Sequence, residues 1–129
     1  MESKELGRLG EQRAIWFYRM RGYAIVARNV RSRNGEIDLI VRRRHVLAFV
    51  EVKTRQSLAA GEGFEAVDRA KQLQLVRLAE EYLASHPHRG EVRYDVLSLF
   101  WANTHFIITY YPNAFQPVSD PRRPWRWTI

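Results

Sequence analysis

The chain has 129 residues, the length of one domain, and can bury a core without disulfides or a structural metal. It has no cysteine, which excludes disulfide scaffolds and cysteine-ligated zinc sites. Its 21 lysine and arginine residues exceed 14 acidic ones, and the net charge of +7 favours a polyanionic partner, nucleic acid ahead of an anionic membrane surface.

The first half of the chain predicts one helix followed by three strands. The helix covers residues 3–21, because side chains recur there near helical spacing and Gly22 is a natural stop. The residues on its predicted inner face are Leu6, Leu9, Arg13, Trp16, Phe17 and Met20. The strands are predicted over 23–28, 36–42 and 46–53.

The second half predicts another helix and two more strands. Asp68 can cap this helix, which follows a loop over 54–65 and continues to about Ser85. The residues on its apolar face are Leu73, Val76, Ala79 and Leu83. The last strands are predicted over 92–100 and 105–111. This order of elements predicts an α/β layer fold with a mixed sheet, in one domain over residues 1–115.

The composition changes from about Pro112 onward. Four prolines in this region disfavour regular structure, which predicts an irregular tail over 116–129. In this tail arginines interleave with Trp125 and Trp127. Such a segment suits stacking on the bases of a single strand, folding back on the core, or binding a second subunit, and all three readings stay open.

Two carboxylates and a lysine interrupt the apolar strands of the first half. Strands disfavour Asp, Glu and Lys, so Asp38, Glu51 and Lys53 need a reason to be there. Glu51 and Lys53 point to the same face because side chains alternate along a strand. Asp38 joins that face if the two strands form a hairpin with an even-numbered loop. The sequence therefore predicts that the three groups converge.

This set of residues suits metal-dependent hydrolysis of a phosphodiester. Mg²⁺ or Mn²⁺ needs one or two carboxylates, so Asp38 and Glu51 would hold it, with the Val52 carbonyl as a candidate third ligand. The metal would lower the pKa of a bound water and polarise the phosphate. Lys53 would orient the attacking water or offset charge on phosphorus. The alternative is a half-solvated sheet whose wet face carries Glu51 and Lys53.

A series of motifs resembles the bacterial YraN-like family over about residues 5–115. The motifs are Gly10-Glu11-x-x-Ala14, Gly22-Tyr23-x-Ile25, Asn29-x-Arg31, Gly35-Glu36-Ile37-Asp38-Leu39-Ile40, Phe49-Val50-Glu51-Val52-Lys53-x-Arg55, Ala66-Val67 with Lys71, Tyr82-Leu83, Arg93-Tyr94-Asp95-Val96 and Asn113-Ala114-Phe115. That family is similar to the PD-(D/E)xK nuclease superfamily, especially the archaeal Holliday-junction resolvases. The resemblance implies a restriction-endonuclease-like three-layer fold, with Asp38, Glu51 and Lys53 matching the catalytic motif. Ile37 replaces the proline of that motif.

The resemblance adds two further site residues. Resolvase-like members bring a glutamate of the first helix to the metal, which implies that role for Glu11, beside the small residues Gly10 and Ala14. The alternative for Glu11 is a favourable interaction with the helix dipole. In similar nucleases a lysine of the second helix completes the site, which implies that role for Lys71. The alternative for Lys71 is a solvated surface lysine.

Other polar residues are weaker candidates. Four arginines flank the proposed site and suit phosphate binding, although surface arginines are usually only solvated: Arg28, Arg31, Arg33 and Arg55. Asp95 lies inside an apolar strand and is interpreted as a structural partner for an arginine. His86 and His88 have the spacing of metal ligands, but they lie in a Pro-Gly break without cysteine and are interpreted as loop residues.

The leading hypothesis is a Mg²⁺- or Mn²⁺-dependent endonuclease that hydrolyses DNA, with branched or structured DNA as substrate by analogy with resolvases. Its expected partner is DNA, either branched or single-stranded. A second hypothesis is a catalytically silent nucleic-acid-binding module, and a third is an interaction protein with a structural acidic cluster. A homodimer would suit an enzyme that cuts two strands. No apolar run is long enough to span a membrane and residues 1–5 lack a signal-peptide core, so we expect a cytoplasmic protein.

Overall fold

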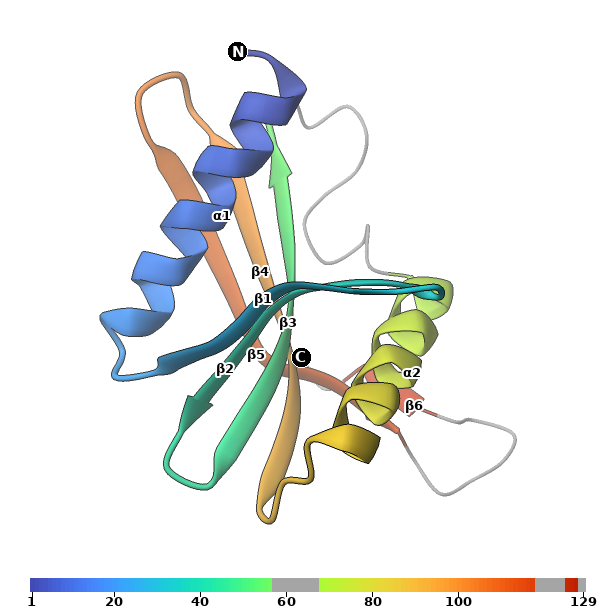
Figure 1. Ribbon diagram of the computed structural model, residues 1–129. Coiled ribbons are helices and arrows are strands. Elements are labelled where there is room, and N and C mark those ends of the chain that lie inside the picture. The colour runs from blue at the N-terminus through green and yellow to red at the C-terminus, as the bar shows by residue number, and fades with distance from the viewer. Residues whose placement is uncertain (57–67, 118–124, 128–129) are drawn as a thin grey trace.

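A computed structural model describes residues 1–56, 68–117 and 125–127 (Figure 1). Its helices are α1 (Ser3–Arg19) and α2 (Arg69–Ser85). Its strands are β1 (Ala24–Ser32), β2 (Gly35–Arg43), β3 (Val46–Arg55), β4 (Glu91–Trp101), β5 (Phe106–Pro117) and β6 (Trp125–Trp127). The strands form one sheet in chain order, in which β3 and β4 are parallel and the other neighbouring pairs are antiparallel. The predicted mixed α/β sheet is confirmed.

The two helices cover opposite faces of the sheet, so the fold has three layers (Figure 1). Side chains alternate along β3 and, from Leu39 onward, along β2, as the geometry of a paired strand requires. The residues that face α1 from these strands are Leu39, Val41, Ala48 and Val50. Those that face α2 are Ile37, Ile40, Leu47 and Phe49. The near-continuous apolar runs of β2 and β3 follow from burial on both sides, and the predicted helix–sheet–helix layering is confirmed.

The buried face of α1 differs from the predicted one. Its buried residues are Leu6, Gly10, Ala14, Ile15, Phe17 and Tyr18. Arg13 is exposed, Trp16 is 59% exposed and Met20 is 72% exposed, so the prediction was wrong at these three positions. The physical reason is close packing: a Cβ added at Gly10 would collide with the Thr54 methyl group, so small residues, not the largest ones, mark the inner face.

The buried face of α2 is also shifted from the prediction. Leu75 and Leu78 are buried, whereas Leu73 is 37% exposed, so Leu73 was wrongly assigned to the core. The predicted cap is confirmed, since Asp68 Oδ1 accepts a hydrogen bond of 3.0 Å from the Lys71 backbone N–H. The described part of the chain includes no helix that is both long and apolar enough to cross a bilayer.

The last strands extend beyond their predicted ends. Strand β5 continues past Pro112 because the pairing with β4 shifts register between Tyr94 and Val96, and such irregularities accommodate proline. Residues 125–127, in the tail predicted as irregular, form β6 and pair with β5. Residues 118–124, 128–129 and most of the predicted loop over 54–65 lie outside the described residues, as do the side chains of β6.

The hairpin of β1 and β2 bends at its tip onto α2 (Figure 1). The Asn34 amide donates a hydrogen bond of 3.2 Å to Glu81, and the Asn34 carbonyl accepts one of 2.9 Å from Gln74, both on α2. Gly35 has φ +138° and lies so close to Gln74 that a Cβ would displace that side chain. These contacts draw the start of β2 away from β3 and open the sheet between them.

Candidate active site

Asp38 lies where β2 separates from β3. The pairing of these strands ends at Leu39 and Val50, and its continuation places Asp38 opposite Glu51. The turn between the strands has two residues, Arg44 and His45, so the even-numbered loop that the parity argument needed is present. Asp38 Oδ2 accepts a hydrogen bond of 2.8 Å from the Val52 N–H. The carboxylate therefore occupies the opening between the strands.

Asp38 and Glu51 share a hollow of about 230 Å³ on the α2 side of this opening, here called the α2-side hollow. The pKa of Asp38 is raised to about 7, first by burial and next by the negative charge of Glu51, while the Val52 hydrogen bond lowers it. Ionisation of both carboxyl groups is unfavourable in this partly buried position unless a cation balances their charge. The predicted convergence of Asp38 and Glu51 on one face is confirmed.

Lys71 supplies one cation at this hollow. Its Nζ lies 3.4 Å from Glu51 Oε1, with the lysine side chain 45% exposed and the glutamate side chain 13% exposed. Lys71 sits in the first turn of α2, and its favourable charge also lowers the pKa of Asp38. The structure therefore brings Lys71 to the carboxylates, where the resemblance had implied it.

Glu11 approaches Asp38 from the other side of the sheet. Both line a second hollow of about 230 Å³, the α1-side hollow, together with Asn29, Val52 and Thr54. The close contact of α1 with Thr54 allows this approach. Glu11 Oε1 accepts a hydrogen bond of 2.7 Å from the Asn29 side chain, which fixes its direction. Asp38 thus separates Glu11 in one hollow from Glu51 and Lys71 in the other.

Lys53 lies two positions beyond Glu51 on β3 and is half-buried. It lines neither of the two hollows among the described residues. Strand alternation still directs it to the face of Glu51. Val52 contributes to the α1-side hollow, and its N–H is held by Asp38.

Sequence reasoning missed Glu36, which lines both hollows. The signal was present, because Glu36 precedes Asp38 by two positions on β2 and so shares its face. Asn29 was also missed as a site residue, because the sequence showed it only as part of a family motif. Its φ of 52° is one that asparagine tolerates, and its side chain orients Glu11 through a hydrogen bond.

Two of the four candidate arginines lie beside the carboxylates. Arg28 and Arg31 line a hollow of about 550 Å³, the basic hollow, whose other cations are Lys4 and Arg8. Arg31 Nε is 4.0 Å from Glu36 Oε1. Arg33 is exposed in the β1–β2 turn.

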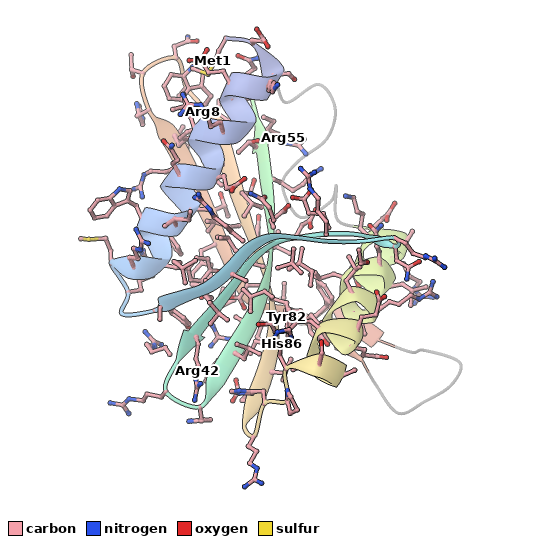
Figure 2. The ribbon with its side chains drawn as sticks, in the orientation of Figure 1. Met1, Arg8, Arg42, Arg55, Tyr82 and His86 are labelled. Atoms are coloured by element: carbon pink, nitrogen blue, oxygen red, sulfur yellow. The ribbon has the colours of Figure 1, made fainter. Side chains whose placement is uncertain are left out.

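Arg55, the fourth candidate arginine, lies at the end of β3, toward the start of α1. Figure 2 labels Arg55 there, with Arg8 on α1 in the same upper part of the view. The Arg55 Nε and Nη1 atoms are buried, with no hydrogen-bond partner in the part of the chain that the structure describes.

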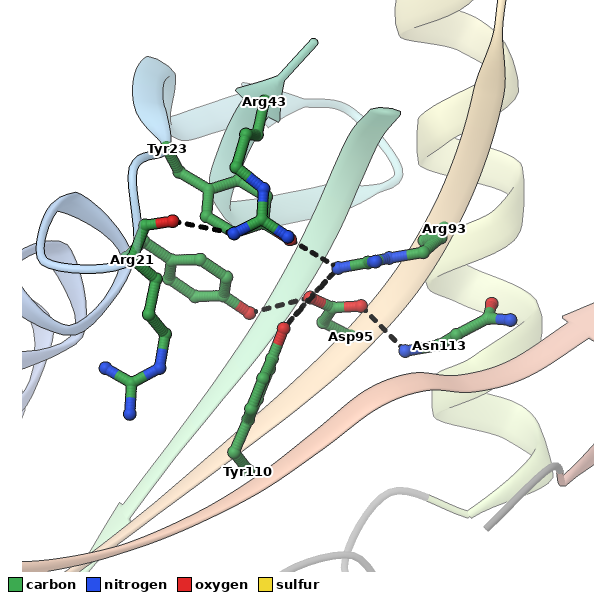
Figure 3. Close-up of polar contacts among 8 residues, drawn as sticks. Arg21, Tyr23, Arg43, Arg93, Asp95, Tyr110 and Asn113 are labelled. Carbon is green, nitrogen blue, oxygen red and sulfur yellow. Dashed lines mark hydrogen bonds and ion pairs between the residues drawn. The ribbon is translucent and has the colours of Figure 1, made fainter. Parts of the chain in front are cut away.

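Asp95 belongs to a separate buried network (Figure 3). It is fully buried and accepts hydrogen bonds from the Tyr18 hydroxyl at 2.9 Å and the Asn113 N–H at 2.8 Å. Arg93 lies 3.4 Å from Asp95 Oδ2, and burial with this carboxylate holds the pKa of Tyr18 well above its usual value. The structural interpretation of Asp95 as an arginine partner is confirmed.

The two histidines after α2 are held by local contacts. His86 ends the helix and stacks on Tyr82 with ring centroids 4.2 Å apart (Figure 2). The ring of His88 is 2.7 Å from the His45 carbonyl. These contacts agree with their interpretation as loop residues.

Comparison with known proteins places this chain in a family. The model of the uncharacterised protein family UPF0102 matches residues 10–99. The chain belongs to the UPF0102 family. A UPF0102 protein of Dictyoglomus thermophilum is 39% identical over 118 residues, which are 89% of this chain and 100% of that protein. A UPF0102 protein of Symbiobacterium thermophilum is 55% identical over 100 residues, 75% of this chain and 83% of that protein.

Membership of UPF0102 confirms the predicted YraN-like family. The matched region contains every proposed site residue, from Glu11 on α1 to Lys71 on α2. The family description assigns no activity, so function is argued from the site itself.

Proposed function

We propose that this UPF0102 protein is a divalent-metal-dependent nuclease that hydrolyses phosphodiester bonds of DNA. The observation that carries the proposal is the pairing of Asp38 and Glu51 in one hollow, where the pKa of Asp38 is raised to about 7. A carboxyl group with a raised pKa that converges with a second carboxylate and a lysine at an opening in the sheet is typical of a functional site. The net charge of +7 suits a polyanionic substrate.

The donor set fits Mg²⁺ or Mn²⁺. No group of three Asp, Glu or His side chains in the described ranges is arranged to hold a metal ion by itself. Mg²⁺ keeps several waters and needs only one or two carboxylates, so Asp38 and Glu51 suffice as protein ligands, with the Val52 carbonyl and Glu11 as further candidates. When bound, the ion supplies an acidified water and polarises the phosphate.

The remaining residues would bind and orient the substrate. Lys71 is already paired with Glu51, so it can move onto a phosphate oxygen when a divalent ion balances that carboxylate. Lys53 would orient the attacking water or offset the charge that develops on phosphorus. Arg28 and Arg31 in the basic hollow would position the strand through its phosphates.

Cleavage of labelled DNA tests this proposal. Junction, flap, single-stranded and blunt duplex substrates are incubated with the protein in Mg²⁺, Mn²⁺ or EDTA. Glu51→Gln and Lys53→Ala should each abolish the metal-dependent cuts, whereas Glu91→Gln, which changes an exposed glutamate at the start of β4, should keep them. Cleavage that survives in both site variants would contradict the proposal. Branched DNA as substrate, a homodimer and a cytoplasmic location are parts of the same proposal.

A catalytically silent DNA-binding module is the second candidate. The ion pair between Lys71 and Glu51 favours it, because a lysine in that position can replace a metal ion as the balancing charge. The two candidates differ in metal binding. Calorimetric titration with Mn²⁺ should show binding that Asp38→Asn and Glu51→Gln each abolish if the protein is the proposed nuclease, and none in the wild type if it is the silent module.

A further inference from the structure

A groove of about 450 Å³ lies along the outer side of α1, on the part of the helix that was expected to face the core. We call it the aromatic groove. Its rings come from Trp16 on α1 and from Trp101 and Phe106 at the turn between β4 and β5. Trp16 is 59% exposed, and Trp101 and Phe106 pack edge to face with centroids 5.0 Å apart. A large aromatic face is thus presented to solvent beside a packed pair of aromatic rings.

The polar part of the aromatic groove is cationic. Arg13 and Arg19 on α1 and Arg28 on β1 line it, and its lining residues include no acidic side chain. None of these three arginines forms an ion pair with another described residue. Aromatic rings interleaved with unpaired arginines are the pattern that binds unpaired nucleotides, because every base has a face to stack and every phosphate a charge to bind.

The aromatic groove continues into the proposed active site. Gln12 and Arg28 line both the aromatic groove and the basic hollow. The basic hollow in turn shares Glu11, Asn29 and Glu36 with the α1-side hollow, where Asp38 lies. The three hollows are therefore continuous, and a single DNA strand can pass from the rings of the aromatic groove, over Arg28, to the carboxylates.

We propose that the aromatic groove binds the unpaired nucleotides of a DNA strand that enters the active site, so that the substrate is single-stranded on one side of the scissile phosphate. This proposal rests on the proposed nuclease function, which defines where the scissile phosphate lies. A second copy of this chain suits the groove less well, because that copy also carries a net charge of +7. Base stacking also explains why the fold leaves Trp16 exposed.

Binding without metal tests the groove separately from catalysis. The full chain, in EDTA, is titrated into a fluorescein-labelled oligothymidylate of about 15 nucleotides, and separately into a blunt duplex, with anisotropy as the readout. The wild type should prefer the single strand. Trp16→Ala should weaken single-strand binding by about 10-fold or more and change duplex binding little. Met20→Ala, which removes another exposed apolar side chain at the C-terminal cap of α1 and outside the groove, is the matched control and should bind as the wild type does.

Salt dependence and oligomeric state complete the test. Arg13→Ala should reduce the slope of log affinity against log salt by about 1 for the single strand. Equal binding by the Trp16→Ala and Met20→Ala variants would overturn the proposal. So would a change in sedimentation of Trp16→Ala without a change in DNA binding, because it would show that a second copy covers the groove.

The groove and the nuclease function can fail independently. Metal-dependent cleavage with unchanged single-strand binding in the Trp16→Ala variant would reject the groove alone. Weakened single-strand binding in that variant, in a protein that never cleaves, would reject the nuclease function and keep the groove as a binding site.

Discussion

Replacing Asp38 with asparagine should stabilise the folded protein at alkaline pH when no divalent metal is present. The pKa of this carboxyl rises from 3.8 to about 7 in the folded state. Below about pH 4 the group is protonated in both states, so it contributes nothing. Between about pH 4 and pH 7 only the folded state keeps the proton, and the free energy of unfolding falls as pH rises. Above about pH 7 this loss is complete.

The pKa shift sets the size of the effect. Each unit of pKa corresponds to about 1.4 kcal/mol, so the shift corresponds to an upper limit of about 4 kcal/mol at alkaline pH. The pKa of about 7 already includes the lowering by the Val52 N–H, and the asparagine keeps an oxygen acceptor for that group. We expect a net stabilisation of about 1–3 kcal/mol near pH 8, and roughly a third of that near pH 5, where the unfolded state has already lost the proton.

Urea unfolding in EDTA, followed by circular dichroism near pH 5 and pH 8, measures this difference. Glu91→Gln is the control, since it removes an exposed carboxylate at the start of β4. Adding Mn²⁺ should then stabilise the wild type near pH 8, by about 2.7 kcal/mol at a hundredfold excess over the dissociation constant, and leave Asp38→Asn unchanged. Equal destabilisation of Asp38→Asn at both pH values would refute the electrostatic reasoning.

Other substitutions test neighbouring features. Asp95→Ala should lower the free energy of unfolding by about 2–4 kcal/mol in urea, because it leaves the half-buried Arg93 charge and the Tyr18 hydroxyl without their buried acceptor; an unchanged midpoint would contradict the network. Gly10→Ala should cost about 1–3 kcal/mol in thermal melts, whereas Gly7→Ala, with open space around it, should not destabilise; equal melting temperatures would contradict the tight packing of α1. Lys71→Ala should raise the pKa of Asp38 further, so the fall in unfolding free energy should continue to higher pH than in the wild type. An unshifted profile of urea stability against pH would argue against the coupling of Lys71 and Asp38.

The convergence of the carboxylates was accessible to sequence reasoning because strand parity is a simple rule. A two-residue turn and period-2 alternation fix the shared face of Asp38 and Glu51 without any knowledge of the rest of the fold. The same rule would have found Glu36. Family resemblance, not spacing, pointed to Glu11 and Lys71, because contacts between a helix and a distant strand leave no local pattern.

The face of α1 was beyond simple periodicity. Trp16 and Met20 are the larger apolar candidates, but the helix turns Gly10 and Ala14 inward, where small side chains let it approach β3. The continuation of β5 past Pro112 depends on a register shift with β4, which sequence spacing does not encode. The opening between β2 and β3 depends on the docking of the hairpin tip on α2, a tertiary contact.

The initial rate of flap or junction cleavage in Mn²⁺, compared between the wild type and Glu51→Gln purified in parallel, tests the central claim most directly. The wild type should cleave only with the metal, and the variant should lose about 100-fold or more of that rate. Equal rates for the two proteins, or equal rates with Mn²⁺ and with EDTA, would contradict the assignment of Asp38 and Glu51 as a metal-binding catalytic pair.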